Sequence, residues 1–376
     1  MERISFTNID VSKNSKITAL CTTSDSKYTL NFESNQPIEF SNDSIALTLA
    51  TLCGNKYDSI FMDIDMSSST YDSISEFTKA ELSCPDTFEE VQSIGKNSVL
   101  SFSGGFDSLA CKYLMPDDTQ LVAIDFGGWF TREKDFFVKY DPLVISTNVR
   151  METPLARNSW AFMAIGALLT SKHFETRTHT FGTTLSTEIM NIPRQQPTLS
   201  LFYPLGIQEA SYVRSLPDIG TARVAIQGNP DVIIESLHSL AGVNDPKRFR
   251  KAHIAKFVGS ELGIDFNIPD EYLIPKTPLP FGVQMYEDLA LIYIAHRDPQ
   301  MMEHPAFSSI PSELMNDLKG ISLEFFNRFA PDPYEGFPEE HLKNLFSQLA
   351  NFGIKPYTST DWENLYKFRE VLRKYY

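Results

Sequence analysis

One run of the sequence restricts the possible folds more than any other. The stretch "NSVLSFSGGFDSLACKYL", Asn97 to Leu114, places two glycines between a short apolar segment and a segment with apolar residues at helical spacing. Gly104 and Gly105 permit backbone conformations with positive φ and lack Cβ atoms, so backbone N–H groups could close around an anion. The start of the following helix would add free donors and partial positive charge. The run predicts a strand, a phosphate-binding turn and a helix.

Other interpretations of this turn fit less well. A Walker A loop is absent, because Gly95-Lys96 is followed by Asn97 and the glycine required upstream is Glu90. The chain has no G-x-G-x-x-G, and a hydrolase elbow would need glycine in place of Ser101. A glycine-rich turn with an ordinary helix cap stays open as the alternative.

The segment 96–260 alternates strand and helix patterns. Strands are expected in "SVLSFS", "TQLVAIDFG", "PLVISTNV" and "TRTHTFGTT", with a long buried helix in "NSWAFMAIGALLTSKHF". This order is typical of α/β proteins, with helices on both faces of a doubly wound parallel sheet.

Two flanking regions complete the predicted division into 1–95, 96–260 and 261–376. The first is expected to be a small α+β module, with a hairpin of "KITALCTT" and "KYTLNFES", a helix in "SIALTLATLCG" and a strand in "DSIFMDIDM". The polar stretch after it predicts a loop and one or two short helices. The last region predicts helices in "VQMYEDLALIYIAH" and "EHLKNLFSQLANFG".

Composition narrows the class of ligand. A formal charge of −15 argues against sequence-independent binding to nucleic acid, because an acidic protein is repelled by the phosphate backbone. The four cysteines, at positions 21, 53, 84 and 111, show no CxxC spacing, so no zinc site is expected and the thiols are taken as reduced and buried.

The 376-residue chain begins without a signal-peptide pattern, and its longest apolar run, Trp160 to Leu169, is about half the length that spans a bilayer. We therefore expect a cytoplasmic protein.

The run "LSFSGGFDSLA" resembles the S-G-G-x-D-S signature of the PP-loop ATP pyrophosphatase superfamily, with the adenine nucleotide alpha-hydrolase-like fold, also called HUP. GMP, NAD and asparagine synthetases are similar members. The resemblance implies an enzyme that cleaves ATP between the α and β phosphates. It implies ATP and Mg²⁺ as cofactors, with Ser103, Gly104, Gly105, Phe106, Asp107 and Ser108 at the nucleotide. Asp107 would act in catalysis with Ser103, and would hold Mg²⁺ through the phosphates.

Further positions follow from the same resemblance. Asp125 and Phe126, at the end of the second strand, would contact adenosine; an ordinary acidic strand end is the alternative. Arg157 would face phosphate or a substrate carboxylate and Asn158 would cap a helix, although the pair could mark a plain helix start. Gly182 and Thr183, with Thr184, would line the nucleotide or substrate side of the sheet.

The nearest branch resembles 7-cyano-7-deazaguanine synthase, from which the chain departs downstream. That branch carries zinc-binding cysteines after the fourth strand, and here the comparable region has none. The resemblance therefore supports neither that zinc site nor that substrate. The region instead holds the basic run Lys247, Arg248, Arg250 and Lys251. It predicts either a phosphate lid with catalytic Lys251 or a solvated helix face.

The leading functional prediction is a ligase that adenylates a carboxylate or amide oxygen of a small molecule or peptide, releases pyrophosphate, and forms a C–N bond with an amine or ammonia. A nucleotide-binding module of a defence or biosynthetic complex, without turnover of its own, is the second hypothesis. Sulfur transfer to a nucleoside ranks below both. For assembly, we expect either a homodimer or a complex with a partner protein. The isolated histidines 173, 179, 238 and 253 are expected to be structural.

Overall fold

The computed structural model describes residues 2–12, 15–89, 94–197, 199–242 and 244–376. They fold into two compact units, each assembled from separate stretches of the chain. Unit 1 contains residues 1–103, 118–181 and 197–210, and unit 2 contains residues 104–117, 182–196 and 211–376. Unit 1 crosses the predicted division after residue 95 and unit 2 crosses the one after residue 260, and the three-part division stays a prediction.

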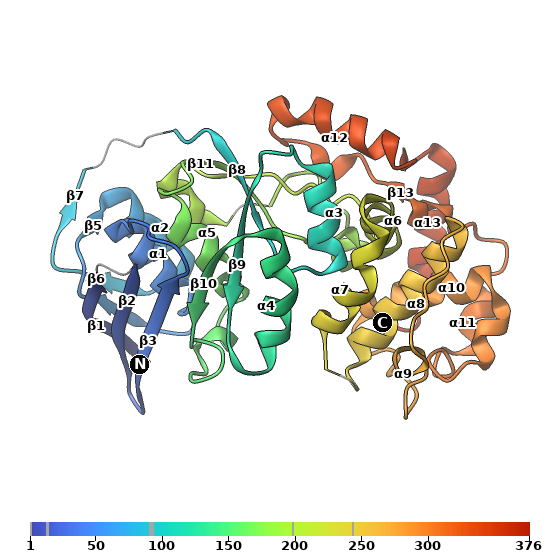
Figure 1. Cartoon of the computed structure of the whole chain (residues 1–376), viewed down its shortest axis with the longest axis horizontal. Coiled ribbons are helices and arrows are strands. Elements are labelled where there is room, and N and C mark those ends of the chain that lie inside the picture. Colours follow the sequence, from blue (N-terminus) through green and yellow to red (C-terminus); the bar gives the residue numbers. More distant parts are fainter. Residues whose placement is uncertain (1, 13–14, 90–93, 198, 243) are drawn as a thin grey trace. The chain divides into compact units, whose positions relative to one another are not determined.

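Unit 1 is an α/β structure around one ten-stranded sheet with the order β12-β11-β8-β9-β10-β3-β2-β1-β4-β6 (Figure 1). Its strands are β1 (Arg3–Ser12), β2 (Lys16–Thr23), β3 (Lys27–Ser34), β4 (Ser59–Met62), β6 (Glu81–Ser83), β8 (Asn97–Ser101), β9 (Gln120–Asp125), β10 (Leu143–Thr147), β11 (Thr176–Thr180) and β12 (Gln208–Glu209). The strand pairs are parallel except β10–β3, β3–β2 and β2–β1. The structure thus confirms the prediction of an α/β fold with a largely parallel sheet.

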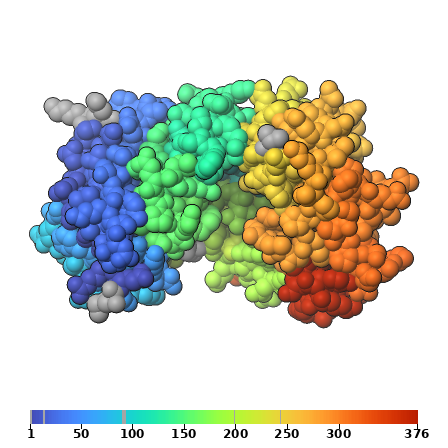
Figure 2. Space-filling view, turned by 90° about the horizontal axis from the view of Figure 1, so that it is seen from below, coloured from blue at the N-terminus to red at the C-terminus, as the bar shows by residue number. Residues whose placement is uncertain are grey.

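The predicted hairpin is confirmed, since β2 and β3 occupy the two segments quoted for it and pair antiparallel. The alternating pattern did not show that β3 would pair with β10, through Ile145 opposite Ser34. This pair joins the N-terminal strands to the parallel strands in one sheet. In Figure 2 the blue atoms of the N-terminal strands adjoin green atoms of the same unit.

Short helices cover the sheet of unit 1. They are α1 (Asn42–Thr51), α2 (Ser68–Thr78), α4 (Thr131–Phe137) and α5 (Ile165–Thr170), and a small pair of strands, β5 (Met66–Ser67) and β7 (Thr87–Phe88), lies beside α2. Helix α5 packs on β8, β9 and β10. The polar stretch around α2 was expected to hold a loop and one or two short helices, and its short strands β6 and β7 were missed.

The long helix predicted over residues 158–174 is wrong in extent. The structure has a 3-10 turn, Trp160–Ala164, followed by the six-residue α5. The hydroxyl groups of Thr170 and Ser171 donate to the carbonyls of Gly166 and Leu168, both at 2.8 Å. Such side-chain bonds to the backbone compete with helical geometry. The buried apolar character was predicted correctly, because every residue of α5 is buried.

His179 of β11 is buried in the sheet of unit 1, as expected for a structural histidine. Its Nε2 atom lies 2.9 Å from the hydroxyl of Ser101, and its ring contacts Phe181 and Phe202. Among the described residues its Nδ1 atom has no hydrogen-bond partner. Burial lowers the pKa of His179 from 6.5 to about 3.

His179 makes the stability of the protein depend on pH. The unfolded chain takes up a proton at this residue below about pH 6.5, whereas the folded protein excludes it down to about pH 3. We therefore expect the free energy of unfolding to fall as the pH falls through this window, by up to about 1.4 kcal/mol per pH unit. Urea titrations between pH 7 and pH 4 should show a shallower fall for His179→Gln. The exposed His173→Gln is the control, and equal slopes for wild type and His179→Gln would contradict the assignment.

Unit 2 is mostly helical. It contains α3 (Phe106–Leu114), α6 (Asp218–Gly228), α7 (Ile233–Leu240), α8 (Pro246–Glu261), α9 (Asp270–Leu273), α10 (Met285–Arg297), α11 (Ser312–Asp317), α12 (Glu339–Asn351) and α13 (Ser359–Leu372), with the short parallel pair β13 (Arg328–Phe329) and β14 (Lys355–Pro356). Helix α6 packs on both α3 and α8 (Figure 1). The helices predicted from "VQMYEDLALIYIAH" and "EHLKNLFSQLANFG" correspond to α10 and α12. None of the helices in the described ranges is long and apolar enough to cross a membrane.

Candidate phosphate-binding site

The glycine turn leads into the first helix of unit 2 in the way that the sequence indicated. Gly104 has a φ of +80°, which costs a residue with a Cβ atom about 1–2 kcal/mol. Gly105 is the N-cap of α3 and has no side chain with which to cap it. The first turn of any helix leaves backbone N–H groups without an intrahelical acceptor. The start of α3 is therefore suited to an anion.

Other parts of unit 2 hold this turn in place. The hydroxyl of the buried Ser236, on α7, donates to the carbonyl oxygen of Gly104 at 2.7 Å. Ser108 donates to the carbonyl oxygen of Gly105 at 3.0 Å. A Cβ atom added at Gly182 would lie only 3.2 Å from the backbone nitrogen of Ser108, so glycine allows this segment to approach the loop closely. The predicted residue Gly182 is thus brought to the loop.

Asp107 is the second residue of α3 and places a carboxylate directly after the glycine turn. Its Oδ1 atom accepts a hydrogen bond of 2.8 Å from the hydroxyl of Thr221 on α6. Both of its carboxylate oxygens lie 3.2 Å from Nζ of Lys251 on α8. The Asp107 side chain is 29% exposed, whereas that of Lys251 is 8% exposed. The carboxylate therefore stays accessible while the ammonium is largely enclosed.

Lys251 keeps its charge despite its burial. Burial on its own would lower the pKa of Lys251, but the charges of Asp107 and Asp218, and their hydrogen bonds, outweigh it. The pKa of Lys251 is consequently raised above its usual value. At neutral pH the site holds one ammonium facing two carboxylates.

Lys251 belongs to the basic run of α8, and the solvated-face interpretation of that run is wrong for three of its members. Arg248, Arg250 and Lys251 are all buried. Arg248 donates to the carbonyl oxygen of His238 at 2.9 Å, and its guanidinium lies over the ring of Tyr272. The buried cations of the run therefore contact other residues of unit 2 and do not face solvent.

Arg250 connects α8 to the start of α10. It donates to Glu287 at 2.5 Å and to the carbonyl oxygen of Pro280 at 3.0 Å. Neighbouring cations on α8 thus bind different partners. Arg250 binds Glu287 at the start of α10, whereas Lys251 binds Asp107 beside the glycine turn. Within the described part of the chain, Lys251 is the member of the basic run that contacts a residue of the predicted site, Asp107.

The remaining predicted residues of the glycine turn and of the segment after β11 differ in exposure. Phe106 is fully buried, and Lys251 lies 5.8 Å from the centre of its ring. Thr183 is partly exposed, and Thr184 is buried. Ser103, the last residue of its stretch of unit 1, is exposed. Their proposed contacts with a nucleotide stay predictions.

Asp125 is the last residue of β9 in unit 1, and Phe126 follows it. Asp125 accepts hydrogen bonds from the backbone of Gly127 at 2.9 Å and from Lys134 at 2.7 Å. Phe126 is 3% exposed, and its ring packs on Phe130 and Phe162. A contact of the Phe126 ring with adenosine would need that packing to open, while the carboxylate of Asp125 stays partly accessible.

Arg157 and Asn158 also belong to unit 1. Arg157 is the exposed end of a 3-10 turn, Leu155–Arg157. Asn158 does not cap a helix through its side chain but donates to the carbonyl oxygen of Leu52 at 2.9 Å, while Ser159 is the N-cap of the following turn. The proposed task of Arg157 stays a prediction.

The cysteines are poor candidates for chemistry. Cys111 on α3 is fully buried, and burial raises its pKa well above the usual value. Cys21 and Cys53 are also buried, whereas Cys84 is only partly buried, against the prediction, and burial raises its pKa as well. Sulfur carriers need an accessible thiolate, so this environment disfavours the sulfur-transfer hypothesis. Within the described part of the chain, no three His, Cys, Asp or Glu residues are grouped so that they could hold a metal ion.

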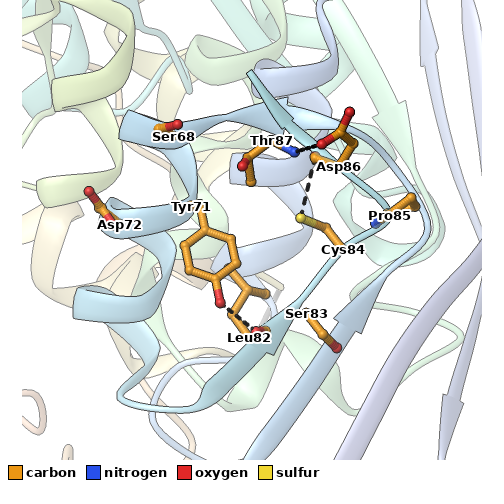
Figure 3. A pocket seen from close by; sticks show the side chains of 9 residues that line it. All are labelled: Ser68, Tyr71, Asp72, Leu82, Ser83, Cys84, Pro85, Asp86 and Thr87. Carbon is orange, nitrogen blue, oxygen red and sulfur yellow. Dashed lines mark hydrogen bonds between the residues drawn. The ribbon is translucent and has the colours of Figure 1, made fainter. Parts of the chain in front are cut away.

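Two surface pockets lie within unit 1. One has a volume of about 550 Å³ and lies between α2 and residues 82–87, with Tyr71, Cys84 and Asp86 in its wall (Figure 3). Tyr71 donates to the carbonyl oxygen of Leu82 across it. The other, of about 580 Å³, is lined by residues that include Lys96, Lys172 and Glu175. Among the described residues that line them, neither pocket contains a predicted site residue.

Asp218, Thr221 and Ser236 are site residues that the sequence interpretation missed. Pro217-Asp218 carries the ordinary signal of a helix start, proline followed by an acidic residue. That signal locates the helix but says nothing of the group that its first carboxylate faces. Comparison with known proteins found no matching family model, no matching curated protein and no matching solved structure.

Proposed function

We propose that this chain is an ATP-dependent ligase of the PP-loop class, with the doubly wound HUP-like arrangement that this class implies. It would adenylate a carboxylate, or an amide oxygen, on a small molecule or peptide and release pyrophosphate. One observation carries the proposal: the accessible carboxylate of Asp107, in a glycine turn that begins a helix, is held 3.2 Å from the buried ammonium of Lys251. An anion-binding turn and a buried cation are what a leaving pyrophosphate requires.

The residues of unit 2 have separable tasks in this proposal. Backbone N–H groups at the start of α3 bind phosphate oxygens. Lys251 stabilises the negative charge that develops on the leaving group. Thr221 orients the carboxylate of Asp107 through its 2.8 Å hydrogen bond. Positioned charges of this kind require no reorganisation during the reaction.

The donor chemistry at the site fits Mg²⁺. This ion prefers oxygen ligands and is commonly held by one or two carboxylates together with substrate phosphates. Asp107 and Asp218 supply two carboxylates, and both lie beside the ammonium of Lys251. When bound, Mg²⁺ would neutralise charge on the phosphates. Asp107 and Asp218 are the residues that would hold it.

The reaction balances without a protein nucleophile. An oxygen of the substrate carboxylate attacks the α-phosphorus, the bond from that phosphorus to the bridging oxygen breaks, and the electron pair leaves with pyrophosphate. An amine or ammonia then attacks the carbonyl carbon, AMP departs with the C–O bond electrons, and the nitrogen loses a proton. The products are an amide, AMP and pyrophosphate.

The test is the identity of the phosphate products. Incubation with ATP labelled at the α-phosphate, Mg²⁺, ammonia or an amine, and a panel of carboxylic acids should yield labelled AMP and an equal amount of pyrophosphate. Using an acid labelled with ¹⁸O in its carboxylate, mass spectrometry should find one ¹⁸O atom in AMP.

The other products separate the alternatives. Labelled ADP would show cleavage between the β and γ phosphates and would refute the proposal. ATP binding without any AMP across the panel would favour a nucleotide-binding module.

A further inference from the structure

A pocket of about 580 Å³ lies in unit 1, at the amino-terminal ends of the parallel strands β8 and β11. Lys96 directly precedes β8, Thr176 begins β11, and both line the pocket together with Asp43 near the start of α1. A pocket of this size suits a small molecule. Ser103 lies beyond the other end of β8 and leads into the glycine turn, so the pocket is separate from the candidate phosphate-binding site.

The wall of the pocket includes a buried carboxylate. Asp43, the second residue of α1, is 3% exposed. Its Oδ1 atom accepts a hydrogen bond of 2.7 Å from the backbone nitrogen of Ser67. No hydrogen bond to its Oδ2 atom is present among the described residues. A buried carboxylate is unfavourable unless a partner compensates its charge, so Oδ2 is suited to a cation from outside the chain.

Thr176 adds a second polar group without a partner. The residue is 3% exposed, and its hydroxyl has no hydrogen-bond partner in the described part of the chain. Close backbone packing fixes its position. Its backbone nitrogen donates to the carbonyl oxygen of Ser171 at 3.0 Å, and a Cβ atom added at Gly95 would lie 2.3 Å from its carbonyl oxygen. Buried hydroxyls in native proteins nearly always have a partner, so an unpartnered one in the wall of a pocket points to a ligand.

The exposed part of the pocket carries two ammonium groups. The side chains of Lys96 and Lys172 are 74% and 53% exposed. Lys96 pairs with Glu175 at 2.5 Å, and Lys172 pairs with Glu39 at 2.8 Å. Ion pairs this exposed contribute little to stability, so a ligand anion can displace the glutamates with a small loss of free energy. Both ammonium groups are therefore open to a carboxylate of a ligand.

The charges in the wall decide the class of ligand. Of the described residues that line the pocket, Asp43 and Glu175 are negative, and Lys96 and Lys172 are positive. A ligand with several charges of one sign would meet like charge here. A ligand with one charge of each sign meets a partner for both.

We propose that this pocket binds a small zwitterion, with a primary ammonium group and a carboxylate, as in a free amino acid. An ammonium group has three N–H donors, which can donate to Oδ2 of Asp43 and to the hydroxyl of Thr176. The carboxylate of the ligand accepts from Lys96 and Lys172. This site is independent of the proposed ATP chemistry, and its test needs no nucleotide.

The first experiment screens the full chain against the twenty standard amino acids, β-alanine, γ-aminobutyrate and ε-aminocaproate in the millimolar range. A ligand that binds the folded protein raises its Tm, and calorimetry then gives its Kd. We expect at least one of these compounds to bind, at one site per chain. Tm values that stay unchanged across the whole panel would overturn the proposal.

Derivatives of the tightest-binding compound test its two charges separately. N-acetylation removes the ammonium group, and amidation removes the carboxylate. Each change should raise Kd by about tenfold or more, because each removes a charged hydrogen-bonding group. An N-acetyl derivative that binds as tightly as its parent would refute the proposal.

Asp43→Asn keeps the size of the side chain and an oxygen that can accept from Ser67, but it removes the charge. Its Kd for the parent compound should rise by about tenfold or more. Asp72→Asn is the matched control, because Asp72 is an exposed carboxylate in the wall of the other pocket of unit 1. Wild-type affinity in a folded Asp43→Asn protein would contradict the proposal.

Thr176→Val separates binding from folding. Valine has nearly the shape of threonine, and the hydroxyl that is removed has no hydrogen bond to lose, so the Tm without ligand should not fall. The Kd for the parent compound should nevertheless rise several-fold. In Lys96→Gln with Lys172→Gln, Kd should rise for the parent compound and stay unchanged for its amide. If Asp43→Asn does not fold, these two variants decide the question, and unchanged Kd values in both would overturn the proposal.

Discussion

Replacing Asp107 by asparagine is expected to lower the formation of AMP and pyrophosphate by about 100-fold or more, while the protein stays folded. The side chain keeps its size, and its amide oxygen can still accept the hydrogen bond from Thr221. What disappears is the negative charge that faces Lys251 at 3.2 Å and that would face Mg²⁺ on the phosphates. Because the carboxylate is 29% exposed, its loss should disturb the interior little.

The measurement is the rate of labelled AMP release under saturating ATP, with circular dichroism and thermal unfolding as checks on folding. Asp117→Asn is the matched control, because Asp117 is exposed and lies on the same stretch of unit 2 just after α3. Wild-type turnover in a folded Asp107→Asn protein would remove Asp107 from the mechanism.

The local elements of this fold were predictable where the apolar pattern repeats over a few residues. The segments quoted for β2 and β3 match the strands residue for residue, since alternation indicates both strands and the polar break between them. The pairing of β3 with β10 was not predictable, because it joins residues more than a hundred positions apart. Strand order depends on such contacts, and a single sequence carries no local signal for them.

The residues of the candidate site also fall into two groups: those that a local motif predicts and those that only long-range contacts bring together. Gly104, Gly105 and Asp107 lie together in one motif, and the chemistry of the glycines and the helix start follows from that motif. Asp218, Thr221 and Lys251 come from two other helices, and only folding brings them to Asp107. The basic run on α8 was visible in the sequence, whereas the burial of three of its four cations was not, because runs of charge usually lie on solvated faces.

Replacing Lys251 by methionine is expected to destabilise the protein by about 1–3 kcal/mol and to abolish binding of Mg²⁺-pyrophosphate. Methionine fills a comparable volume but leaves Asp107 and Asp218 without their shared cation. Removing one partner of a fully buried ion pair costs about 3–5 kcal/mol. The two carboxylates here are 29% and 19% exposed, so water compensates part of that cost.

A double variant separates the charge of Lys251 from its packing. In Lys251→Met with Asp218→Asn, one of the two uncompensated carboxylates is gone, so much of the lost stability should return, whereas pyrophosphate binding should not. Urea unfolding of wild type, both single variants and the double variant gives the coupling free energy between the two residues. Additive losses in this cycle would mean that Lys251 and Asp218 are not coupled. Recovery of pyrophosphate binding in the double variant would instead show that the ammonium is dispensable at the phosphate site.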